Sequence, residues 1–125
     1  MYFQYNSFDF RIVYITEAHP TDGWSVKSPS QPIVMQQKTF EERLDTAIMF
    51  RKRVEDVIKV KILVDDMDNR ANIVFGAIPE RLAVLYNGKL KWLGGPGPMK
   101  YSVEDLENYL STLIQENKCN IQYIQ

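Results

Sequence analysis

A chain of 125 residues with 45% hydrophobic and 25% charged side chains has the composition of an ordinary globular protein. This length predicts a single domain, residues 1–125. The formal net charge is −1 and the longest basic run is Arg51-Lys52-Arg53, so no nucleic-acid partner is expected. No apolar run approaches the roughly 18 residues of a membrane span, and the single cysteine, Cys119, allows no internal disulfide. Together these features predict a soluble protein of the reducing cytoplasm.

The first predicted strand covers residues 10–16, which are rich in β-branched and aromatic side chains. A polar loop over residues 17–32 follows, and it holds the only histidine, His19. Thr39 and Glu42 have the spacing of a capping box, which predicts the start of a helix that ends near Val54. The helix has an apolar stripe that is expected to face the core, made of Phe40, Leu44, Ala47, Ile48 and either Phe50 or Arg51.

The middle of the sequence predicts a strand, a short helix and a hairpin. The strand covers residues 60–65 and ends in acidic residues. Asp68 or Asn69 is expected to cap the short helix, which runs to Phe75 and stops at Gly76. Asn87-Gly88, between residues 82–86 and 90–93, is the strongest short-range signal for a β-hairpin.

The last predicted element is a helix capped by Ser102, and residues 116–125 are expected to form a flexible tail. The resulting order is β-α-β-α-β-β-α. This order predicts an α/β protein with the middle and C-terminal parts of a thioredoxin-like three-layer fold. The first strand and first helix of that fold are expected to be lacking from this chain.

Four blocks of the sequence resemble, in order and spacing, the iodothyronine deiodinases, a family of thioredoxin-like selenoenzymes. The first block, residues 13–24 (Val-Tyr-Ile-Thr-Glu-Ala-His-Pro-Thr-Asp-Gly-Trp), is very specific, and the other three reinforce it. These are residues 65–69 (Asp-Asp-Met-Asp-Asn), residues 79–85 (Pro-Glu-Arg-Leu-Ala-Val-Leu), and residues 94–98 (Gly-Gly-Pro-Gly-Pro) with Tyr101. Some family members carry a basic residue where this chain has Pro96.

The resemblance implies reductive removal of iodine from iodothyronines or related iodinated phenols. The family nucleophile is a selenocysteine within a Ser-Cys-Thr-Sec-Pro-Pro type motif, which is expected upstream of Met1, and an external thiol serves as reductant. A selenocysteine codon misread as a stop would give a chain that restarts at the next methionine. By resemblance His19, Glu17 and Glu80 are active-site residues, with His19 a proton donor or hormone ligand. No bound cofactor is expected.

His19 has a plainer interpretation as a loop histidine bonded to a backbone carbonyl. A metal site is not expected, because zinc needs three or four ligands and this histidine is alone. If His19 instead delivers a proton, a carboxylate from Glu17 or Glu80 is expected to hold it.

Two further residues are candidates for contact with substrate. Trp24 either lines a pocket for aromatic rings or plugs the loop. Pro79 follows Ile78 where thioredoxin-like proteins keep a cis-proline that faces the active site, so the Ile78–Pro79 bond is either cis, by this analogy, or trans, as most X–Pro bonds are.

The implied partners are an iodinated aromatic substrate and a thiol reductant. Family members commonly form homodimers and are anchored by an N-terminal membrane segment, so a homodimer is allowed here, although residues 1–125 contain no such segment. The alternative function is a non-catalytic thioredoxin-like binding or scaffold module.

Overall fold

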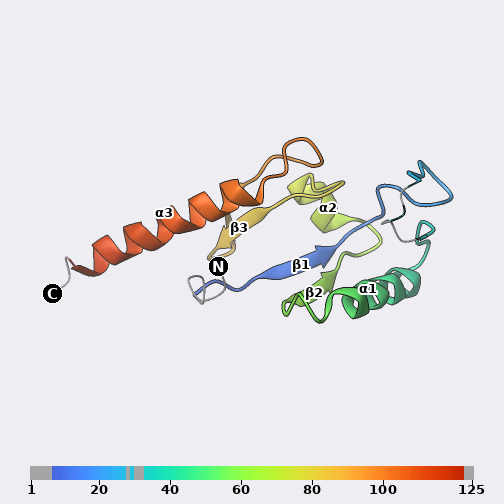
Figure 1. Cartoon of the computed structure of the whole chain (residues 1–125), viewed down its shortest axis with the longest axis horizontal. Coiled ribbons are helices and arrows are strands. Elements are labelled where there is room, and N and C mark those ends of the chain that lie inside the picture. Colours follow the sequence, from blue (N-terminus) through green and yellow to red (C-terminus); the bar gives the residue numbers. More distant parts are fainter. Residues whose placement is uncertain (1–6, 28, 30–32, 123–125) are drawn as a thin grey trace. The chain divides into compact units, whose positions relative to one another are not determined.

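The computed structural model describes residues 7–27, 29 and 33–122, in the order strand, helix, strand, helix, strand, strand and helix (Figure 1). The mixed α/β class predicted from the sequence is confirmed. The chain divides into two compact units, one of which is Phe8–Pro79 and the other of which contains the residues from Glu80 onward. The expectation of a single domain stays a prediction. None of the helices within the described ranges is long and apolar enough to cross a membrane.

A parallel pair of strands forms the centre of the first unit. Strand β1 (Arg11–Tyr14) pairs with β2 (Lys61–Val64), with Ile12 opposite Ile62 and Tyr14 opposite Val64. Successive side chains of a strand point to opposite faces, and burial alternates accordingly along both strands. Helix α1 (Phe40–Val54) connects the two strands and packs against β2 (Figure 1).

The N-terminus of α1 has the predicted capping box. The Thr39 side chain accepts a hydrogen bond from the Glu42 amide, and the Glu42 carboxylate accepts one from the Thr39 amide. The apolar stripe is only partly covered, because Phe40, Leu44 and Ile48 remain 39–43% exposed. The two buried residues of the helix are Ala47, as expected, and Arg43, which the sequence pattern did not single out.

Helix α2 (Arg70–Phe75) ends as predicted, but its N-terminus is capped differently. Gly76 adopts a left-handed conformation with φ of 54°, and its amide bonds back into the last turn. Asn69 occupies the N-cap position without a side-chain bond. The capping carboxylates belong instead to Asp65, which accepts hydrogen bonds from the Ala71 and Asn72 amides, each at 3.0 Å, and to Asp66, which accepts one from the Arg70 amide at 3.1 Å. Asn69, one of the two predicted caps, thus has the N-cap position but not the capping bond.

The second unit combines a hairpin with a helix. Strands β3 (Ala83–Tyr86) and β4 (Lys89–Leu93) are antiparallel, and Asn87 and Gly88 have φ of 50° and 71°, as the predicted tight turn requires. Helix α3 (Val103–Gln122) begins after Ser102, whose hydroxyl accepts a hydrogen bond from the Asp105 amide at 3.1 Å. The helix extends through residues 116–122, where a tail was expected, and residues 123–125 lie outside the described ranges.

Candidate functional site

The loop after β1 is closed by hydrogen bonds to the segment that precedes α1. The Thr21 amide donates to the Val34 carbonyl at 2.8 Å, and the Gln36 amide donates to Asp22 Oδ1 at 2.8 Å. The Gln36 side chain also donates to Thr16 Oγ1 at 2.7 Å. These bonds hold the two ends of the loop together. Residues 17–24 therefore form a defined structure at the carboxyl end of β1.

His19 is held by the backbone of its own loop. Its Nδ1 lies 3.0 Å from the Trp24 carbonyl oxygen, and the rings of His19 and Trp24 meet edge to face with centroids 5.1 Å apart. Since a carbonyl oxygen only accepts, Nδ1 carries the proton and donates it. Nε2 is then the nitrogen left for proton exchange with another molecule. The bond to the Trp24 carbonyl matches the plainer interpretation of this histidine, and a carboxylate from Glu17 or Glu80 beside it stays a prediction.

Glu17 is half-buried and belongs to a polar cluster with Tyr14, Gln37 and Arg43. The Tyr14 hydroxyl donates to Glu17 Oε1. Burial raises the pKa of the Glu17 carboxyl above its ordinary value of 4.5, whereas a hydrogen bond from Gln37 and the charge of Arg43 oppose that rise. Glu17 therefore retains a proton to higher pH than an exposed glutamate does, which is a property typical of acid–base groups.

Arg43 is the member of this cluster that sequence reasoning missed. Its side chain is 1% exposed, and Nη1 donates to the backbone carbonyls of Asp65 and Asp66 at 3.3 and 2.5 Å. Its position in the sequence could have indicated its burial. Arg43 lies three residues after Phe40 and four before Ala47, and therefore on the same helix face as the apolar stripe. A charged residue on a buried helix face indicates a buried polar contact.

The two candidate substrate-binding residues both lie in the first unit. Trp24 is 78% exposed and meets His19 edge to face, so it does not plug the loop and its indole remains accessible. The Ile78–Pro79 peptide is cis, the first of the two alternatives, and Gly97–Pro98 is also cis, which was not predicted. The substrate-binding roles of Trp24 and Pro79 stay predictions.

Glu80 belongs to the second unit, where it packs on the glycine-rich turn of residues 94–98. The Gly97 amide donates to the Glu80 carbonyl at 2.9 Å, and Arg81 Nε donates to the Gly94 carbonyl at 2.7 Å. A Cβ atom at position 97 would collide with the Glu80 carboxylate. Gly97 is therefore required for the observed position of the Glu80 side chain, whose role beside His19 stays a prediction.

Substituting Gly97 with alanine is expected to displace the Glu80 side chain but to lower the free energy of unfolding by no more than about 1 kcal/mol, because the colliding atoms are the end of a flexible side chain that can change rotamer. Urea unfolding measures the stability change, and the carbon chemical shift of the Glu80 carboxyl reports the displacement. Met99→Ala is the matched control, because Met99 is 91% exposed and its truncation should change stability by less than about 0.5 kcal/mol. An unchanged Glu80 signal in the Gly97 variant would contradict the prediction.

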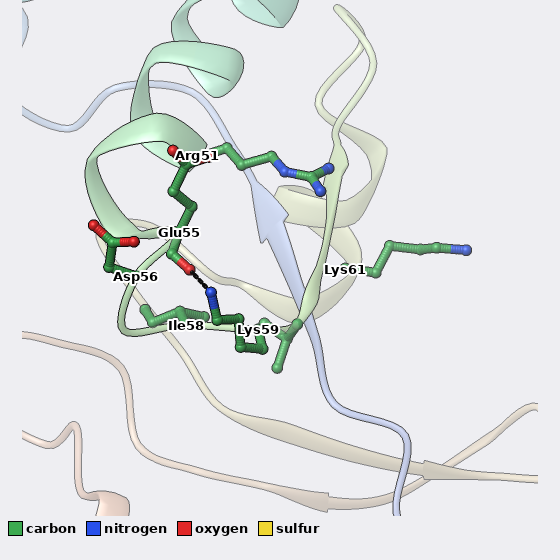
Figure 2. Close-up of a pocket in the computed structure, with 7 residues that line it drawn as sticks. Arg51, Glu55, Asp56, Ile58, Lys59 and Lys61 are labelled. Carbon is green, nitrogen blue, oxygen red and sulfur yellow. Dashed lines mark hydrogen bonds between the residues drawn. The ribbon is translucent and has the colours of Figure 1, made fainter.

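The cavity in Figure 2 belongs to the first unit and contains none of the predicted site residues. It has a volume of about 470 Å³ and is lined by the end of α1, the following loop and the start of β2. Arg51, Lys59 and Lys61 bring positive charge, Glu55 and Asp56 bring negative charge, and the Lys59 ammonium donates to the Glu55 backbone carbonyl at 2.5 Å. Because β1 and β2 are parallel, this cavity is at their amino ends, whereas the Glu17 loop follows the carboxyl end of β1.

Comparison with known proteins gives consistent matches. A family model described as iodothyronine deiodinase matches residues 2–114. The type II iodothyronine deiodinases of Rattus norvegicus and Homo sapiens are each 35% identical over 104 residues, which is 82% of this chain and 39% and 38% of theirs. The thyroxine 5-deiodinase of Sparus aurata is 37% identical over 102 residues, or 82% of this chain and 37% of its own. The chain thus spans less than two fifths of the length of these relatives.

Proposed function

Because this chain belongs to the iodothyronine deiodinase family, we propose that it is part of an oxidoreductase that removes iodine reductively from iodothyronines or related iodinated phenols. The observation that carries the proposal is the family match over residues 2–114, which includes the complete loop of Glu17 and His19. The closed loop and the bond that orients His19 through Nδ1 support it. Cys119, the only cysteine of this sequence, lies near the C-terminal end of α3.

The chemistry that we propose for these residues is proton delivery. Replacing a carbon–iodine bond by a carbon–hydrogen bond requires one proton at the ring carbon and two electrons from an external thiol reductant. A selenolate or thiolate supplied from outside residues 1–125 would attack the iodine. His19 in its charged form would donate the ring proton from Nε2 while the Trp24 carbonyl orients the imidazole through Nδ1. Glu17 and Glu80 would serve as acid–base groups in the same reaction.

We also propose that the chain is one thioredoxin-like domain of the three-layer type, lacking the first strand and helix, that works in the cytoplasm and is able to form a homodimer. The support for the fold is local. A helix connects two parallel strands in the first unit, and an antiparallel hairpin followed by a helix forms the second. Parallel strands joined through a helix are typical of α/β proteins.

Binding of an iodinated phenol is testable through Trp24, whose exposed indole lies beside His19. The other tryptophan, Trp92, stacks on Tyr109 in the second unit, so Trp92→Phe leaves Trp24 as the single reporter. Thyroxine is expected to quench Trp24 fluorescence saturably, because iodine is a heavy-atom quencher and the exposed indole is free to stack on an aromatic ring. Iodine-free thyronine controls for binding without the heavy atom.

Two further measurements are needed to interpret the fluorescence titration. Trp24→Phe in the wild-type background should leave only the weak response of Trp92. An equal response from Trp92 alone would argue against the site. If the longer protein that carries this chain binds thyroxine but releases no iodide with a thiol reductant, the non-catalytic binding module becomes the better description.

A further inference from the structure

Gln36 is bonded to both flanks of the loop that carries His19. Its side-chain amide donates to Thr16 Oγ1 at 2.7 Å, and its backbone amide donates to Asp22 Oδ1 at 2.8 Å. These two bonds form the Gln36 clasp. Thr16 precedes His19 by three residues and Asp22 follows it by three. One residue, twenty positions from Thr16 and fourteen from Asp22, therefore holds the two ends of the His19 segment at a fixed separation.

The segment that carries Gln36 is itself anchored at the start of α1. The capping box of Thr39 and Glu42 begins three residues later, and the Glu42 carboxylate also accepts a hydrogen bond from the Lys38 amide at 2.7 Å. Gln36 is partly buried, and the next residue, Gln37, is 5% exposed. Because the helix end is already ordered, little conformational entropy remains to be lost when the Gln36 side chain bonds across the loop.

The orientation of His19 depends on the separation that the Gln36 clasp fixes. Nδ1 of His19 donates to the Trp24 carbonyl, and Trp24 lies only two residues beyond Asp22. A hydrogen bond weakens steeply when its donor and acceptor move apart or out of line. A displacement of Asp22 would therefore move the carbonyl that holds the imidazole.

We propose that Gln36 is a positioning residue for proton transfer at His19, and that the Gln36 clasp keeps the neutral imidazole in the tautomer with its proton on Nδ1. The inference rests on the proposed role of His19 as proton donor. When the charged ring releases its Nε2 proton, the neutral ring left behind carries its proton on Nδ1, where the Trp24 carbonyl accepts it. The histidine side chain in water favours the opposite tautomer, so this one depends on a carbonyl held in place.

The test follows the ring nitrogens of His19 by NMR in the full chain, where it is the only histidine. At about pH 9, where an imidazole is neutral, the wild type is expected to carry the proton on Nδ1. Gln36→Ala removes the side-chain bond of the clasp. The ratio of the Nδ1–H to the Nε2–H tautomer should then fall by about 2- to 12-fold, the equilibrium equivalent of one neutral hydrogen bond. An unchanged ratio, or a wild type with the proton on Nε2, would overturn the proposal.

Substitutions at Thr16 separate the clasp from a general loosening of the loop. Thr16→Val removes the accepting hydroxyl and keeps the branched shape, so it should reproduce the ratio of Gln36→Ala, and the two changes together should add little. Thr16→Ser retains the hydroxyl and should keep the wild-type ratio. Met35→Ala, at a neighbouring side chain that is 62% exposed, should keep it as well. Equal ratios in Thr16→Val and Thr16→Ser would contradict a role for the hydroxyl and with it the proposal.

A measurement on the wild type keeps the proposal testable if Gln36→Ala does not fold. Amide hydrogen exchange reports whether a backbone donor is bonded in the native state. The Gln36 amide, which donates to Asp22, is expected to exchange at least about tenfold more slowly than in an unfolded chain. Exchange at the rate of an unfolded chain would refute the clasp. None of these measurements requires deiodination, so a failure of the proposed function would be recognised separately.

Discussion

Replacement of His19 by glutamine is expected to lower the rate of the proposed deiodination by about 10²- to 10⁴-fold, the usual contribution of a positioned general acid. The loss should appear in kcat with little change in KM, because the proton is transferred only in the transition state. Glutamine still offers an amide donor to the Trp24 carbonyl, but it carries no proton that it can release to a ring carbon. The measurement is release of labelled iodide from iodothyronine by the longer protein, with a thiol reductant.

Thr21→Ala is the matched control for this experiment. Thr21 lies two residues away in the same loop, its side chain is exposed, and its amide, which the substitution keeps, makes the bond to the Val34 carbonyl. The deiodination rate of Thr21→Ala should remain within about twofold of the wild type. Surface substitutions usually change stability by less than about 0.5 kcal/mol, so the loop should stay folded in this variant. If His19→Gln raises KM and leaves kcat intact, His19 is a substrate ligand and the proton comes from another group.

Replacement of Asp65 by alanine is expected to lower the free energy of unfolding by about 2–4 kcal/mol. Its buried carboxylate accepts hydrogen bonds from three backbone amides, of Asp66, Ala71 and Asn72, each at 3.0 Å. Each bond to a charged group contributes about 1.5–3 kcal/mol, and bonds that share one acceptor are not additive. Removing the carboxylate leaves the Ala71 and Asn72 amides of α2 without their cap, while the Arg70 amide keeps its bond to Asp66. Urea unfolding followed by circular dichroism measures the loss.

Asp68→Ala provides the comparison, because Asp68 is exposed and is one of the two residues that the sequence pattern predicts as a cap. The structure predicts a change of less than about 0.5 kcal/mol for this variant. A larger loss in Asp68→Ala than in Asp65→Ala would reverse the assignment of the capping residue.

The parts of the fold that the sequence predicted correctly depend on neighbouring residues. The capping box of Thr39 and Glu42 spans one turn of helix, the Asn87-Gly88 turn requires two left-handed residues, and Gly76 ends α2 through its own backbone. Such interactions form within a few residues, so the local sequence carries their full physical cause. The family was also identifiable from sequence, since residues 13–24 form an uninterrupted and specific block.

Tertiary structure decided the contacts that give these elements their chemistry. Arg43 reaches carbonyls more than twenty residues away, and Asp65 caps a helix from the end of the preceding strand. The sequence shows which residues are charged or polar. Their partners depend on which strand ends are brought together by packing. Burial then sets the strength of each contact, because a charged group removed from water needs hydrogen-bonding partners within the protein. By itself the sequence determined the elements, the family and the residues of the Glu17 loop. Packing determined that the Trp24 carbonyl holds His19 and that Arg43 lies buried against the Asp65 and Asp66 carbonyls.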